Sequence, residues 1–309
     1  LTPDATLLDL ENAGMLVPTS GLTDIATQIE PASFSYDGKK VAFNPMNGSL
    51  ASPRQKVVVM DFDAATNGFS NPVTVVDNEP DMVAQHRPGW PTFTPGGSLI
   101  YHQQVQQGGD GNNEAALHTR RGAKAYLAWT PADAATPAPL NRLNGLNEDG
   151  SSYLPKLAAP MSMTCTADSQ SVGGLDADHA DDANLNYEPT VNPIASGGYA
   201  WVVFTTRRMY GTVANIPPFC SDPRGVNLIT NTTTKKLWVA AVNLSGEPGT
   251  DISQPAFYLP AQELLAGNTR GAWVLDPCRD DGASCGTGDQ CCGGFCSENG
   301  QGDLVCSID

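Results

Sequence analysis

An acidic run holds the densest set of potential metal ligands in the sequence. Between residues 176 and 184, oxygen-bearing side chains come from Asp176, Asp178, Asp181, Asp182 and Asn184. Proteins bind Ca²⁺ through about six to eight oxygen ligands, so this run could supply part of a calcium shell. The residue order excludes an EF-hand loop. A calcium site and a solvated acidic loop both stay open, and Ca²⁺ is the one cofactor that the sequence suggests.

The histidines could take part in acid–base chemistry only if the fold brings them to acidic residues. They are far apart in the sequence, at His86, His102, His118 and His179. The sequence lacks the G-x-S-x-G and H-E-x-x-H motifs, a P-loop and a haem-attachment motif. A glycosidase would need two carboxylates roughly 5–9.5 Å apart, with Glu188, Asp37 and Asp178 as candidates. We expect a binding protein rather than an enzyme, with an exported glycosidase or peptidase-like hydrolase as the alternative.

The net charge narrows the classes of partner. The chain has 309 residues, with 17 Lys and Arg against 33 Asp and Glu, which gives a formal net charge of −16. Such a charge repels nucleic acids and anionic membranes unless a basic patch is present. The densest basic stretches are the pairs Arg120-Arg121 and Lys235-Lys236. Because of this charge, we do not expect nucleic-acid binding. Because the sequence has no run of about 18 apolar residues, we do not expect membrane insertion.

Eight cysteines indicate an oxidising compartment. Six of them lie in the last 32 residues, and the other two, Cys165 and Cys220, are 55 residues apart. An even number with such clustering predicts disulfides, whereas zinc is disfavoured because the tail contains no His. The pair Cys165–Cys220 is expected to hold a long loop. We expect an extracellular, cell-surface or periplasmic protein from which a leader or longer segment before Leu1 was removed.

The C-terminal segment resembles the inhibitor cystine-knot, or knottin, framework. From Cys278 the spacing is C-x₆-C-x₅-C-C-x₃-C-x₉-C, with Gly293-Gly294 after the adjacent cysteines. The resemblance implies the pairings Cys278–Cys292, Cys285–Cys296 and Cys291–Cys306. So short a segment has too few apolar residues to fold by burial alone, so the bridges must hold it. We expect a rigid cap or contact surface, with an inhibitory knottin as the alternative.

A recurring phrase organises the rest of the chain. Phe-Ser or Phe-Thr, a turn with Asp-Gly or Gly-Gly, and alternating apolar residues occur in residues 32–43 and 90–101, with a looser copy in 187–204. Each copy predicts a β-hairpin, because such turn residues tolerate positive φ. Further apolar runs follow the hairpins, in residues 56–63, 72–76, 125–129 and 236–243. Each unit therefore has the strand content of a propeller blade.

These phrases resemble WD40-like, TolB-type β-propeller repeats, whose hallmark is P-x-F-S-P-D-G-K-x-I-x-F. The resemblance covers roughly residues 20–275, with Tyr36 in place of the usual Pro and Gly96 in place of Asp. It implies an all-β fold of propeller-like antiparallel sheets in residues 1–277, followed by the disulfide module in 278–309. An all-β sandwich is the alternative, and the only helices we expect are short, in residues 6–13 and 260–265.

Three copies of the phrase do not close a ring, which needs at least about four blades. Degenerate blades near residues 1–30 and 140–186, missing upstream sequence, or another chain would have to complete it. We expect a secreted or cell-surface protein that presents propeller loops to a protein or glycan partner, and homo- or hetero-oligomeric assembly stays open. The resemblance implies a bacterium with an outer membrane. Asn47, Asn231 and Asn243 fit the N-x-S/T glycosylation pattern.

Overall fold

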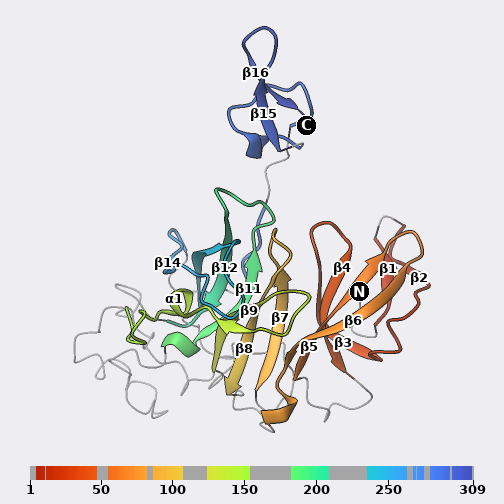
Figure 1. Cartoon of the computed structure of the whole chain (residues 1–309), viewed down its shortest axis with the longest axis vertical. Helices are drawn as coiled ribbons and strands as arrows, with labels where there is room; N and C mark the ends of the chain where they lie inside the picture. Colours follow the sequence, from red (N-terminus) through yellow and green to blue (C-terminus); the bar gives the residue numbers. More distant parts are fainter. Residues whose placement is uncertain are drawn as a thin grey trace. The chain divides into compact units, whose positions relative to one another are not determined.

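The structure is a computed structural model whose chain divides into two compact units, Leu1–Gly271 and Ala272–Asp309. It describes residues 5–10, 12–46, 55–81, 86–106, 124–153, 182–208, 235–262, 267–268, 270–274, 279–292 and 294–307. Figure 1 shows the elements of both units. In the first unit the prediction of propeller-like antiparallel sheets is confirmed, and no described helix is long and apolar enough to cross a membrane.

Three four-stranded antiparallel sheets follow one another along the first unit. The first sheet comprises β3 (Gln28–Phe34), β4 (Lys40–Met46), β5 (Lys56–Asp63) and β6 (Gly68–Asp77). The second comprises β7 (Arg87–Phe93), β8 (Leu99–Gln106), β9 (Lys124–Thr130) and β10 (Ala138–Pro139). The third comprises β11 (Asn186–Val191), β12 (Tyr199–Thr206), β13 (Lys236–Asn243) and β14 (Phe257–Tyr258). In every sheet the strands are adjacent in chain order, as in a propeller blade.

Each sheet opens with the hairpin that the repeated phrase predicts. The first turn places Gly38 at a φ of 68° and the second places Gly97 at 81°. Both values lie in the left-handed region that a side chain disfavours, which explains the Asp-Gly and Gly-Gly pairs of the phrase. The hairpin strands and the following apolar runs are confirmed at the predicted places.

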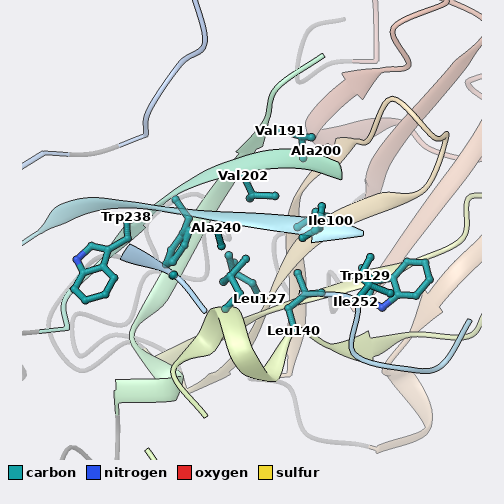
Figure 2. Packing of buried hydrophobic residues seen from close by; sticks show 14 of the residues in the cluster. Ile100, Leu127, Trp129, Leu140, Val191, Ala200, Val202, Trp238, Ala240 and Ile252 are labelled. Atoms are coloured by element: carbon teal, nitrogen blue, oxygen red, sulfur yellow. The ribbon is translucent and has the colours of Figure 1, made fainter. Parts of the chain in front are cut away.

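The sheets stack face to face, so the second sheet is buried on both sides. Leu99 and Tyr101 of β8 pack with Val57 and Val59 of the first sheet. Ile100, between them in sequence, points the other way and packs with apolar residues of the third sheet, in the cluster that Figure 2 shows. Because successive strand residues face opposite sides, burial of both faces explains why these strands are continuously apolar.

The stacking brings the first strands of the sheets together, because β7 contacts both β3 and β11. Tyr36 lies in the turn after β3. Its hydroxyl donates a hydrogen bond to the backbone oxygen of Val191 in β11, with 2.8 Å between the two oxygens. The same phenol is hydrogen-bonded to the Thr92 side chain of β7, and burial raises its pKa. The residue that departs from the repeat pattern therefore joins all three sheets.

The predicted helix in residues 6–13 is wrong. β1 (Leu7–Asp9) pairs instead with β2 (Met15–Val17). Ala13 and Gly14 both have positive φ, and the Asp9 carboxylate accepts from the backbone and side chain of Asn12. This turn chemistry outweighs the helical spacing of the leucines. The degenerate blade expected near residues 1–30 is thus a hairpin.

The helix expected in residues 260–265 and the blade expected near residues 140–186 fall only partly within the described residues. The helix expected in residues 260–265 is absent from residues 260–262, and the rest of it lies outside the described residues. Residues 140–153, where a further blade was expected, contain the short helix α1 (Asn141–Asn144) and turns, and residues 154–181 lie outside the described residues.

The second unit is a small hairpin held by disulfides. β15 (Phe295–Glu298) pairs with β16 (Leu304–Ser307). Two predicted bridges are present, Cys285–Cys296 and Cys291–Cys306. Cys292 is also disulfide-bonded, while its expected partner Cys278 lies outside the described residues. The bridged cysteines form the buried cluster of this unit, and they indicate an oxidising environment.

We expect Tyr36→Phe to lower the free energy of unfolding by about 0.5–1.5 kcal/mol, because it removes the hydrogen bond to Val191 without changing the packing. Urea denaturation measures the change. Tyr199→Phe is the matched control, since the exposed Tyr199 side chain makes no hydrogen bond among the described residues. Equal stabilities of the two variants would contradict the joining role of Tyr36.

We expect the double variant Cys291→Ser and Cys306→Ser to destabilise the second unit by about 2–5 kcal/mol, because the unfolded segment gains conformational freedom. Amide hydrogen exchange should show lost protection in β15 and β16 and unchanged protection in β7 and β8. Unchanged protection of β15 would mean that burial, rather than the bridge, holds the hairpin.

Candidate functional site

All three first strands carry a β-bulge at the same place, including β3, where the register shifts between Glu30 and Ser33. The register shifts between Gly89 and Thr92 in β7 and between Tyr187 and Thr190 in β11. Inside the bulges, Trp90 has a φ of 52° and Glu188 a φ of 51°, and a proline follows each. Positive φ at such residues costs of order 1–3 kcal/mol. Since bulges redirect side chains, the shared bulge places an indole and a carboxylate at the junction of the second and third sheets.

Glu188 is held by hydrogen bonds to β8 and β12. Its backbone N–H donates to Nδ1 of His102 in β8 at 3.3 Å, and its Oε2 accepts from the hydroxyl of Thr205 in β12 at 3.3 Å. The Thr205 hydroxyl accepts in turn from the backbone N–H of Arg270 at 2.9 Å. Glu188, His102 and Thr205 are buried. Because Nδ1 of His102 accepts, the neutral imidazole carries its proton on Nε2.

Trp90 and Arg270 form a stacked pair beside Glu188. The Arg270 guanidinium carbon lies 4.2 Å from the centre of the Trp90 ring, a cation–π geometry. The Arg270 side chain is exposed, whereas Nε1 of Trp90 is buried and has no hydrogen-bond partner among the described residues. The pair therefore presents a fixed cation to solvent.

Further cations surround the same carboxylate. Burial and the Arg207 guanidinium lower the pKa of Lys235, and Glu188 opposes both effects. The Arg270 side chain is exposed at the surface but partly covered by its neighbours, and this partial burial also lowers the pKa of Arg270, again opposed by Glu188. Arg207 is fully buried, with its guanidinium 5.8 Å from the centre of the Tyr187 ring.

We call this set of residues the inner-strand cluster. It comprises Trp90, His102, Glu188, Thr205, Arg207, Lys235 and Arg270. Glu188 is a carboxylate whose charge acts on both Lys235 and Arg270. Three cationic side chains against one anionic one give the cluster an excess of positive charge in a chain of net charge −16. The arrangement suits the binding of an anionic group.

The structure brings together some of the candidates for acid–base chemistry. His102 and Glu188 meet, as described, whereas His118, His179 and Asp178 lie outside the described residues. Asp37 is exposed in the β3–β4 turn, where its carboxylate accepts from Ser35 and Lys39. The residues of the cluster that were not predicted from the sequence are Trp90, Thr205, Arg207, Lys235 and Arg270. The x-Pro pair shared by all three repeats is the signal that could have pointed to Trp90.

The remaining predicted site residues stay predictions. Asp176, Asp178, Asp181, Cys165, Cys220, Asn47 and Asn231 lie outside the described residues. Asp182 and Asn184 belong to a 3₁₀ turn, η5 (Asp182–Asn184). In the described ranges, the one group of three or more His, Cys, Asp or Glu ligand atoms within 4.8 Å is formed by disulfide-bonded cysteines. Asn243 is half-buried at the end of β13, where its Oδ1 accepts from the backbone of Ser245.

Comparisons with known proteins give only weak likenesses. Neither a protein family nor a curated protein sequence matches the chain. Among solved structures, a thermostable family-43 glycoside hydrolase matches with a TM-score of 0.33 and 11% identity, over 79% of this chain and 59% of that one. Hydrazine synthase of Kuenenia stuttgartiensis matches with a TM-score of 0.32 and 11% identity, over 83% of this chain and 65% of that one. The chain thus spans less than two thirds of either structure, and at these scores neither likeness informs on function.

We expect Glu188→Gln to lower the free energy of unfolding by about 1–3 kcal/mol, because it removes the counter-charge of partly buried cations at constant volume. The pKa of Lys235 should fall further for the same reason, which NMR titration of its ε-amine measures. Asp37→Asn is the control in an exposed turn. An unchanged pKa of Lys235 would contradict the electrostatic role of Glu188.

Proposed function

We propose that this chain is an exported, non-enzymatic binding protein whose inner-strand cluster holds the carboxylate of an acidic glycan. The observation that carries the proposal is the excess of cationic side chains around Glu188, at two strained bulges, in an otherwise acidic chain. The disulfides and the resemblance to TolB-type repeats support a place on the surface or in the periplasm of a bacterium.

The exposed cation of the cluster is suited to a carboxylate. A guanidinium offers parallel donors that match both carboxylate oxygens, and stacking on Trp90 restricts the rotation of Arg270 before any ligand arrives. A uronic acid carries its carboxylate on a rigid ring, so it loses less conformational freedom on binding than a flexible acidic side chain of a protein. These two features favour an acidic glycan over a protein partner.

A binding role also fits the charges better than hydrolysis does. Glycoside hydrolysis by the common mechanisms needs a pair of carboxylates across the scissile bond. Of the seven residues that make up the inner-strand cluster, Glu188 is the one carboxylate. The other charges are cations, which favour retention of an acidic ligand.

We expect the chain to bind oligogalacturonides more tightly than neutral galacto-oligosaccharides of equal length, as measured by calorimetry. Arg270→Gln and Lys235→Gln should each lower the affinity for the acidic ligand by about tenfold or more, because each removes one interaction between a cation and the ligand carboxylate. Added salt should weaken binding further. Lys39→Gln is the matched control, since Lys39 is exposed in the β3–β4 turn.

Equal affinity for the two sugars, or oligogalacturonide binding that survives both variants, would overturn the acidic-glycan proposal. Reducing-end assays on the same mixtures test the alternative. Release of new reducing ends by the native chain and not by Glu188→Gln would make it a hydrolase.

A further inference from the structure

A pocket lies between α1 and the loop that joins β13 to β14. Its volume is about 490 Å³, within the range of roughly 300–1,000 Å³ that small-molecule sites span. Three hydrogen bonds pin the loop to the second sheet and α1. Nε1 of Trp129 donates to the Thr250 backbone oxygen at 2.7 Å. The backbone N–H groups of Arg142 and Leu143 donate to the side chains of Asp251 and Ser253 at 2.9 and 3.0 Å.

The pocket wall is packed closely enough to hold a fixed shape. Gly246 approaches Ile252 so closely that a Cβ at position 246 would lie 2.1 Å from Cγ2 of Ile252. Ile252 belongs to the buried core that the second and third sheets share. The lining is therefore supported by the sheets themselves, which favours a site formed before ligand arrives.

Four carboxamides dominate the lining, and much of their hydrogen-bonding capacity is unused. The side chains of Asn141 and Gln254 make no hydrogen bond among the described residues. Asn243 uses only Oδ1, toward Ser245, and Asn147 uses only Nδ2, toward Ser151. Each carboxamide offers donors and acceptors together. The pocket thus presents both kinds of group from several sides.

The charged groups of the lining are already compensated. Arg142 forms an ion pair with Glu148. The Asp251 carboxylate accepts from the backbone N–H and hydroxyl of Ser253 and from the backbone of Arg142. Gly246 and Ile252 are the apolar members of the lining. An anion, a cation or an apolar molecule would each find little to bind, whereas a neutral molecule rich in hydroxyl groups matches the free carboxamides.

We propose that this pocket binds a neutral saccharide through Asn141 and Gln254, with Asn147 and Asn243 beside them. Each sugar hydroxyl both donates and accepts a hydrogen bond, as each carboxamide does. The site shares no residue with the inner-strand cluster, so the inference does not rest on the acidic-glycan proposal.

The test begins with the full chain on an array of neutral gluco-, manno-, galacto- and xylo-oligosaccharides. Calorimetry with the strongest binder then compares Asn141→Ala and Gln254→Ala with the native chain. Each variant should weaken binding by about tenfold or more, because sugar hydroxyls lose their partners in the pocket. The melting temperature should stay unchanged, since these side chains make no hydrogen bond within the described protein. Gln28→Ala is the matched control, an exposed carboxamide on β3 outside the pocket.

Failure of every neutral oligosaccharide to bind, or binding that survives both pocket variants, would overturn the inference. The two proposals are distinguishable by crossed variants. Arg270→Gln should leave neutral-sugar affinity unchanged, and Asn141→Ala should leave oligogalacturonide affinity unchanged. A loss of neutral-sugar binding in Arg270→Gln equal to that in Asn141→Ala would assign the sugar to the inner-strand cluster instead.

Discussion

Burial of both faces of the second sheet is the constraint on which the first unit depends. Leu99 and Ile100 are neighbours in β8, yet they pack against different sheets. A strand can do this only if apolar residues occupy both alternating positions, and each buried side chain of this kind contributes about 1.5–3 kcal/mol. The first and third sheets both pack on the second sheet. The two apolar cores on its faces therefore set the distance between the first strands of the three sheets.

The inner-strand cluster is a product of that packing. Its bulges hold Trp90 and Glu188 in backbone conformations that an isolated hairpin would abandon. Apolar burial on either side offsets the strain, and the charged side chains then find partners along β8 and β12. The carboxamide pocket has a different origin, because a loop of the third sheet lies against α1 and its polar groups are only partly satisfied by the protein. The stacked sheets thus carry a charged cluster and a carboxamide-lined pocket of different chemistry.

The sequence predicts the strands and the tail well because both follow local rules. Turn glycines such as Gly38 and the alternation around Leu99 mark the hairpins, and the cysteine spacing marks the two observed bridges. The hairpin at residues 7–17 was missed because the turn at Ala13 and Gly14 competes with a helical apolar spacing. Most of the inner-strand cluster was missed for another reason. Arg270 and Trp90 are 180 residues apart, and their contact depends on packing that no local pattern encodes.

The attachment of the segment after β14 has a mechanical consequence. Arg270 is tied to Thr205 through its backbone, and Gly271 is so close to Val203 that a Cβ there would lie 2.7 Å from a valine methyl. The second unit begins at the next residue, Ala272. Tension applied through the disulfide-bonded tail would therefore act on β12 of the third sheet, through these two anchors, before it reached the first or second sheet. The cation–π pair of Arg270 and Trp90 thus lies at the point where the chain leaves the first unit.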